Sequence, residues 1–136
     1  MLLQLTDLSD EPLHQQLSRQ VRAKILAGDL ADGESLPSIR GLAREARVSV
    51  ITVQRAYEDL EREGLILARR GKGFFVRAMS EASKENMARE RFSGALEPVV
   101  TEGRAEGLDD AIMAEIFHRV LKSDVSSSDD GTEKTS

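Results

Sequence analysis

An aliphatic, an amide and a guanidinium side chain stand close together in the sequence, at Ile51, Gln54 and Arg55. On a helix that advances about 100° per residue, these three share one arc with Glu58. A solvated helix face would be polar or charged throughout. A guanidinium can pair with guanine, an amide with adenine, and an aliphatic chain can contact a thymine methyl group. The combination favours a helix that lies in a DNA groove.

The segment from Ser49 to Gly64 is predicted to form this helix. Ser49 can accept a hydrogen bond from an amide of the first turn, and Gly64 can adopt the left-handed conformation that ends a helix. The residues between them include neither proline nor glycine. The arc opposite the polar face carries the residues that we expect in the core, namely Val53, Ala56, Tyr57 and Leu60.

Two further helices are predicted before this one. The first opens at Glu11 and Pro12 and ends at Gly28. The second is capped by Ser38. Its apolar residues, and those of the first helix, are Leu13, Leu17, Val21, Ile25, Leu26, Ile39, Leu42, Ala43 and Ala46. A turn of three residues, 47–49, joins the second helix to the third, which is the arrangement of a helix-turn-helix whose second helix reads the DNA.

A β-hairpin is predicted after the third helix, with strands at 65–68 and 74–77. Its loop contains Arg69, Arg70, Gly71, Lys72 and Gly73. Three cations and two glycines allow close approach to phosphates or to a minor groove. The alternative is a loop that is basic for solubility alone. A nucleotide-binding loop is disfavoured because no helix follows the glycines.

The distribution of charge agrees with a nucleic-acid partner, although the whole chain carries −5. Residues 12–77 contain 12 basic and 8 acidic side chains, whereas residues 1–11 contain 0 and 3, and residues 78–136 contain 7 and 13. A positive middle between acidic ends is typical of a DNA-binding domain with a separate second segment.

Other classes of protein are disfavoured. The sequence has no cysteine, and neither His14 nor His118 has companions at metal-ligand spacing, so we expect no metal, no cofactor and no thiol chemistry. No pattern of catalytic residues predicts an enzyme. The absence of long apolar runs predicts neither a membrane span nor a signal peptide, and hence a cytoplasmic protein.

The C-terminal part is predicted to form two amphipathic helices, the first kinked or split at Pro98 and the second capped by Asp109. Together they carry more apolar surface than each can bury on the other, which predicts a homodimer. The alternative is packing back onto the first domain. The predicted dimerisation residues are Met87, Phe92, Leu96, Val99, Val100, Ile112, Ile116, Phe117, Val120 and Leu121. Residues 123–136 are predicted to be a disordered acidic tail.

Residues 10–77 resemble the winged-helix domain of the GntR family of bacterial transcription regulators. The resemblance rests on motifs that include Gly33-Glu34-Ser35-Leu36-Pro37-Ser38 and Gly71-Lys72-Gly73-Phe74-Phe75-Val76. The stretches 37–40 and 52–57 resemble the YtrA subfamily in particular. That resemblance implies a short regulator that dimerises through about two terminal helices and often controls genes for ABC-type transporters.

The resemblance also implies DNA contacts from Arg40, Ser49, Thr52 and Gly71. The sequence departs from the family at Val50, Ile51 and Gln54, so a family operator cannot be transferred. From their chemistry, Arg40 and Arg55 are candidates for guanine, Gln54 for adenine and Ile51 for a thymine methyl group. The candidates for phosphate contacts are Arg44, Arg47, Thr52, Arg69, Arg70 and Lys72.

The predicted fold is mostly α with a small β-hairpin wing. Residues 1–11 lead into a winged helix-turn-helix domain at 12–77, which is followed by a helical dimerisation segment at 78–122. The predicted function is a dimeric transcription repressor that binds a palindromic operator. The alternative is a winged-helix module that binds another protein and has little affinity for DNA. Residues 78–122 are too few for an enclosed pocket, so a small-molecule effector of unknown identity would bind between subunits, or none exists.

Overall fold

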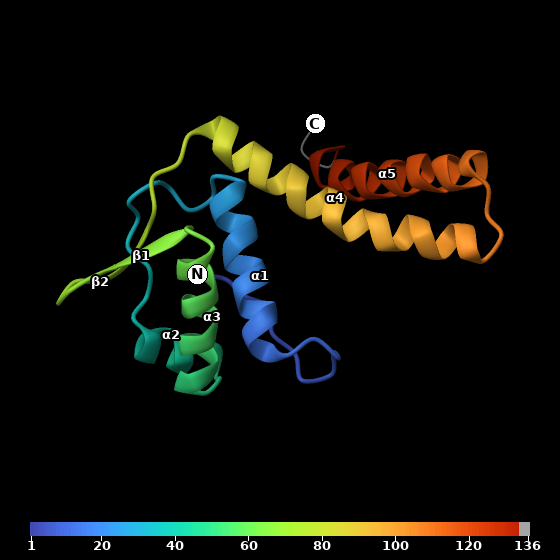
Figure 1. The fold of residues 1–136 in the computed structure, drawn as a ribbon. Helices are drawn as coiled ribbons and strands as arrows, with labels where there is room; N and C mark the ends of the chain where they lie inside the picture. Colours follow the sequence, from blue (N-terminus) through green and yellow to red (C-terminus); the bar gives the residue numbers. More distant parts are fainter. Residues whose placement is uncertain (134–136) are drawn as a thin grey trace. The chain divides into compact units, whose positions relative to one another are not determined.

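The computed structural model describes the backbone of residues 1–133 and the side chains of residues 1–123. The chain forms two compact units, Met1–Ala88 and a second unit that begins at Arg89. The elements follow one another as helices and one hairpin in the order seen in Figure 1.

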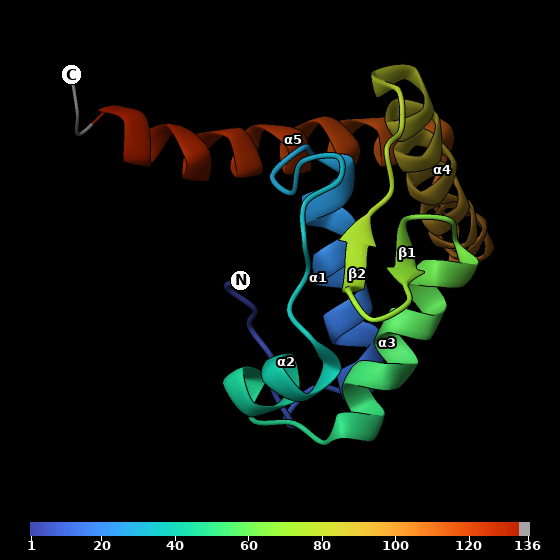
Figure 2. The same ribbon diagram turned by 90° about the vertical axis from the view of Figure 1, so that its left-hand side faces the viewer.

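The first unit is a winged helix-turn-helix, as predicted. Its helices are α1 (Leu13–Leu26), α2 (Ile39–Ala46) and α3 (Val50–Arg62). Strands β1 (Ile66–Arg69) and β2 (Gly73–Val76) pair antiparallel, with Ile66 opposite Val76 and Arg69 opposite Gly73. Strand β1 contacts α3, and Figure 2 shows the chain before α2 running along the hairpin. An isolated antiparallel bridge joins Ser35 of that chain to Phe75.

The core of the first unit consists of the residues that the helical periodicity predicts. Leu17, Val21, Ile25, Leu42, Val53, Ala56 and Leu60 have exposed fractions of 0%, and Tyr57 of 1%. Leu65, Ile66 and Val76 of the hairpin region complete this core. Helix α3 packs against both α1 and α2. Burial of α3 therefore leaves only one of its faces available for a partner.

The ends of the short helices confirm the predicted caps. Ser38 accepts a hydrogen bond from the amide of Gly41 at 3.0 Å, and Ser49 accepts one from the amide of Thr52 at 3.1 Å. Gly64, with a φ of 79°, follows α3 in the left-handed conformation. These caps place the turn between α2 and α3 within residues 47–49.

Helix α4 (Glu81–Ala105) begins in the first unit and continues into the second. Its side chain Lys84 is 5% exposed, and its Nζ lies 3.1 Å from Oδ1 of Asp32. Met79 and Met87 pack against the core of the first unit. The compact unit therefore extends to Ala88, beyond the boundary at residue 77 that the sequence predicts.

The second unit contains the rest of α4 and α5 (Asp110–Glu133). The predicted split at Pro98 is wrong, because α4 is one continuous helix with this proline inside it. Gly107 has a φ of 92°, and Asp109 accepts a hydrogen bond from the amide of Ile112 at 2.9 Å, which confirms the predicted cap. The described backbone is helical to Glu133, and a disordered tail from residue 123 stays a prediction. The rest of that predicted tail, residues 134–136, lies outside the described residues.

Candidate nucleic-acid interface

The outward face of α3 carries the side chains predicted to read bases. Val50 and Ile51 are 45% and 57% exposed, and Gln54 and Arg55 are also exposed. Nε2 of Gln54 lies 3.2 Å from Oε1 of Glu58, one turn further along the helix. The face thus offers apolar contacts, an amide and a guanidinium together, which are the groups that base edges in the major groove require.

The first turn of α3 is partly occupied by its own cap. The hydroxyls of Ser49 and Thr52 lie 2.9 Å apart, and the Ser49 hydroxyl also accepts the Thr52 amide hydrogen bond. Thr52 is half-buried. Its hydroxyl therefore has a structural partner before any phosphate arrives, unlike the arginines around it.

Three exposed arginines, Arg40, Arg44 and Arg47, lie on α2 and the turn that follows it. Arg47 adopts φ 58° and ψ 45°, and in the described part of the chain it is the one non-glycine residue with a positive φ. A left-handed conformation is unfavourable for an arginine, because its Cβ crowds the backbone. An arginine at this position therefore costs backbone strain that a glycine would avoid.

The hairpin tip brings the remaining predicted residues together. Gly71 and Gly73 have φ values of 74° and 99°, and the amide of Lys72 donates to the carbonyl of Arg69 at 2.9 Å. The guanidinium carbon of Arg69 lies 5.3 Å from the centre of the Phe75 ring. Arg70 and Lys72 are exposed. Only glycine tolerates these backbone angles without strain, so the tip can turn tightly and present its main chain.

The basic side chains of this surface are not consumed by internal ion pairs. The salt bridges of the first unit engage Arg19, Arg22, Arg62 and Lys84. Within the described residues, none of the candidate cations has a carboxylate partner, and these are Arg40, Arg44, Arg47, Arg55, Arg69, Arg70 and Lys72. Unpaired cations on α2, α3 and the hairpin are available to neutralise phosphates.

One connection that holds this surface together was not predicted. The hydroxyl of Tyr57 donates a hydrogen bond of 2.7 Å to the carbonyl of Pro37, and its ring makes an edge contact with Phe74 at a centroid distance of 4.9 Å. Burial, with a smaller contribution from the charge of Glu45, raises the pKa of Tyr57. The helical periodicity of the sequence predicted that Tyr57 lies in the core. It could not predict the partner of the hydroxyl, because that partner depends on tertiary contacts.

A second unpredicted connection joins α1 to the C-terminal end of α3. Arg22 forms two hydrogen bonds with the carboxylate of Glu63, from Nε at 2.6 Å and from Nη2 at 2.8 Å. The Arg22 side chain is only 10% exposed. A bidentate pair of this kind fixes orientation as well as distance, so it sets the angle between α3 and the helix behind it.

The predicted dimerisation residues differ in their exposure to solvent. Phe92, Val99 and Val120 are 58%, 65% and 51% exposed, and Ile112, Ile116, Phe117 and Leu121 lie between 36% and 46%. Leu96 and Val100 are half-buried. Met87 differs from all of these because it packs on the core of the first unit. The ring centroids of Phe92 on α4 and Phe117 on α5 lie 6.4 Å apart, so these side chains connect the two helices.

Metal clusters and membrane spans are absent from the described residues. In this part of the chain no group of three or more histidines, aspartates or glutamates is arranged to hold a metal ion. No helix there has the length and apolarity needed to cross a membrane. A hollow of about 310 Å³ on α4 is lined by residues of that one helix, among them Ser93, Glu97 and Arg104, so it is a surface groove.

The fold and the basic, partly apolar face of α3 define a winged helix-turn-helix protein of the DNA-binding class. A family profile described as "Bacterial regulatory proteins, gntR family" matches residues 13–76. The uncharacterized HTH-type transcriptional regulator YhcF of Bacillus subtilis is 33% identical over 89 residues, which cover 63% of this chain and 74% of that protein. The chain belongs to the GntR family of transcription regulators, which are not enzymes, and within the family it is YtrA-like.

Two proteins named YtrA support this subfamily. The HTH-type transcriptional repressor YtrA of Bacillus subtilis is 36% identical over 75 residues, which cover 55% of this chain and 58% of that protein. The solved structure of YtrA from Sulfolobus acidocaldarius, described as a GntR-family transcription factor, is 31% identical. Its TM-score is 0.57, and the match covers 71% of this chain and 99% of that one.

Proposed function

We propose that this transcription regulator is a homodimeric repressor that acts in the cytoplasm and binds a palindromic operator with one α3 helix in each half-site. The observation that carries the proposal is the set of unpaired cations that surrounds the exposed face of α3. The similarity to a repressor named YtrA supports the sign of regulation. Control of transporter genes is what the resemblance to that subfamily implies.

We assign the direct reading of bases to the N-terminal half of α3 and to Arg40 of α2. Ile51 is 57% exposed, although an isoleucine gains no stability from exposure to water. The side-chain amide of Gln54 donates a single hydrogen bond to Glu58, one turn further along the helix. Exchange of this weak contact for adenine leaves the fold unchanged. Arg40 and Arg55 are the candidates for guanine.

We assign the phosphate contacts to the cations at the edges of the exposed face of α3. Arg44 and Arg47 extend from α2 and its turn, and Arg70 and Lys72 from the tip of the hairpin. Such contacts set the register of the protein on the duplex without reading its sequence. They also make the affinity fall steeply as salt rises, because each neutralised phosphate releases counterions.

The second unit supports dimerisation. Its exposed apolar side chains on α5 recur along the helix at positions 112, 116, 117, 120 and 121, and Phe92 and Val99 of α4 are also exposed. An apolar stripe of this length is costly to leave in water. A two-fold dimer would cover it with the same surface of a second copy and match a palindromic operator.

The proposal is tested by titration of the full-length protein into labelled DNA from upstream of its own gene, read by fluorescence anisotropy. We expect Arg55→Ala to weaken binding to this fragment more than binding to random DNA, and Arg70→Ala to weaken both alike. Arg19→Ala is the matched control, because Arg19 lies on α1, outside the proposed surface, and pairs with Glu11, which precedes that helix. Binding that responds equally to all three substitutions, or that is absent at low salt, contradicts the proposal.

A further inference from the structure

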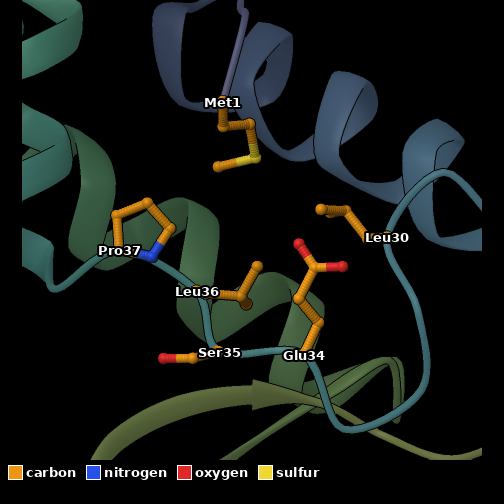
Figure 3. Close-up of a pocket in the computed structure, with 6 residues that line it drawn as sticks. All are labelled: Met1, Leu30, Glu34, Ser35, Leu36 and Pro37. Atoms are coloured by element: carbon orange, nitrogen blue, oxygen red, sulfur yellow. The ribbon is translucent and has the colours of Figure 1, made fainter.

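The first unit contains a hollow of about 370 Å³ that the DNA surface does not use. It is lined by Met1, Leu30, Glu34, Ser35, Leu36 and Pro37 (Figure 3). Leu30 and Leu36 are 9% and 5% exposed, and the Met1 side chain is 5% exposed. Apolar walls and a volume of a few hundred Å³ are typical of sites for small molecules.

Two of the residues that line this hollow carry a charged group. The terminal ammonium of Met1 lies 3.3 Å from Oε1 of Glu45 and is paired with it, so the carboxylate of Glu34 is the charge left for a ligand. Figure 3 shows the Glu34 carboxylate pointing toward the space between Met1 and Leu30, whereas the Ser35 hydroxyl points away from it. Oε1 of Glu34 accepts a hydrogen bond from the amide of Ala31 at 3.0 Å. In the described part of the chain, no lysine or arginine pairs with this carboxylate. The hollow therefore favours a cation and disfavours an anion.

The wall of the hollow is connected to the three elements of the proposed DNA surface. Leu36 and Pro37 lead directly into Ser38, the cap of α2. The carbonyl of Pro37 accepts the hydrogen bond of Tyr57 on α3, and the amide of Leu36 donates to the carbonyl of Phe74 on β2 at 2.9 Å. A ligand that displaces this segment must therefore move α2, strain the contact to α3 or shift the hairpin.

We propose that this hollow binds a small organic amine in its protonated form and that the occupied protein has a different affinity for DNA. The ammonium group pairs with Glu34, and the apolar part of the ligand lies against Leu30, Leu36 and the Met1 side chain. Charge-assisted hydrogen bonding selects the cation, and burial of its carbon chain supplies the rest of the affinity. The change in DNA affinity rests on the proposed function, whereas the binding of the amine does not.

Binding is tested by nuclear magnetic resonance of the full-length, ¹⁵N-labelled protein. Hexylammonium is the probe, and 1-hexanol and hexanoate are controls with the same carbon chain. We expect hexylammonium to shift the amide signals of Ala31, Ser35 and Leu36 to saturation and the controls to shift them far less. Glu34→Gln keeps an oxygen for the Ala31 amide but removes the charge, so we expect it to weaken hexylammonium binding about fivefold.

Glu61→Gln is the matched control, because Glu61 is an exposed carboxylate of α3 and does not line the hollow. Equal affinity of 1-hexanol and hexylammonium, or equal loss of affinity in Glu34→Gln and Glu61→Gln, overturns the proposal. The regulatory part is read from DNA anisotropy with and without hexylammonium. Saturable binding with no change in DNA affinity overturns that part alone, whereas absence of any DNA binding contradicts the proposed function and leaves the amine site to be judged by the resonance data.

Discussion

The hydroxyl of Tyr57 on α3 donates a hydrogen bond of 2.7 Å to the carbonyl of Pro37, the residue before the cap of α2. The helix that faces outward toward DNA is therefore attached, through its buried side, to the start of the preceding helix. The same ring contacts Phe74 of the hairpin. One buried side chain thus connects the three elements of the proposed DNA surface.

Tyr57→Phe keeps the ring and removes this hydrogen bond. We expect the free energy of unfolding to fall by about 1 kcal/mol, with some loss of DNA affinity, because the Pro37 carbonyl loses its donor. Urea denaturation of both proteins at neutral pH measures the difference. An unchanged midpoint with an unchanged slope would show that the bond contributes nothing net.

The raised pKa of Tyr57 predicts a pH dependence. In the unfolded chain a tyrosine loses its proton at about pH 10, whereas in the folded protein it keeps the proton to higher pH. The folded state then binds more protons than the unfolded state, so stability falls as pH rises above about 10. Comparison of the unfolding free energies of wild type and Tyr57→Phe between about pH 9 and 11 isolates this contribution. A difference between the two proteins that stays constant across the range contradicts it.

Arg47→Gly separates stability from function. Glycine adopts the observed φ of 58° without strain, so we expect the domain to gain about 0.5–1 kcal/mol in the free energy of unfolding. DNA affinity should fall at the same time, and the slope of log affinity against log salt should decrease by about 1. Arg47→Lys, which retains the charge and the strain, is the control for DNA binding. A protein that gains stability with undiminished affinity would remove Arg47 from the interface.

Gln54→Ala tests direct reading by α3. We expect it to relax the preference at one base pair of each half-site, at about 1–3 kcal/mol, because the amide pairs with adenine. Selection of binding sites from a randomised library by wild type and variant reveals the position. Equal weakening on specific and random DNA would mean that Gln54 does not read a base.

Phe117→Asp tests the proposed dimer. Phe117 is 36% exposed and lies 6.4 Å from Phe92, so a charge there should prevent burial of the apolar stripe. Sedimentation should show that the variant is a monomer, and circular dichroism should show unchanged helical content. His118→Asp places the same charge at the next exposed position of α5 and should leave the dimer intact. If both variants were monomers, or if both were dimers, the assignment of this face to the dimer interface would be contradicted.

Much of the first unit follows from local patterns. The caps at Ser38 and Ser49, the left-handed Gly64 and the buried arc of α3 each depend on a few neighbouring residues, so the sequence was sufficient to predict them. The hydrogen bond of Tyr57 and the Arg22–Glu63 pair join residues that are distant in the chain, and no local pattern encodes them.

Pro98 and Met87 show where local reasoning fails. A proline disfavours the interior of a helix, but the loss of one backbone hydrogen bond can be outweighed by the turns on either side, and α4 continues through it. The sequence marked Met87 only as an apolar position of its helix, and which surface it meets is a tertiary property. It packs on the first unit's core, a contact that the predicted dimerisation role did not include.

Footprinting of the purified full-length protein on the DNA upstream of its own gene, at two salt concentrations, tests whether the protein binds a palindromic operator. We expect a protected, two-fold symmetric site whose half-sites lie about one helical turn, roughly 10 base pairs, apart, with protection that weakens at the higher salt. Failure to protect any site, together with no salt-dependent retention of random DNA, would contradict it and favour a winged-helix module that binds another protein.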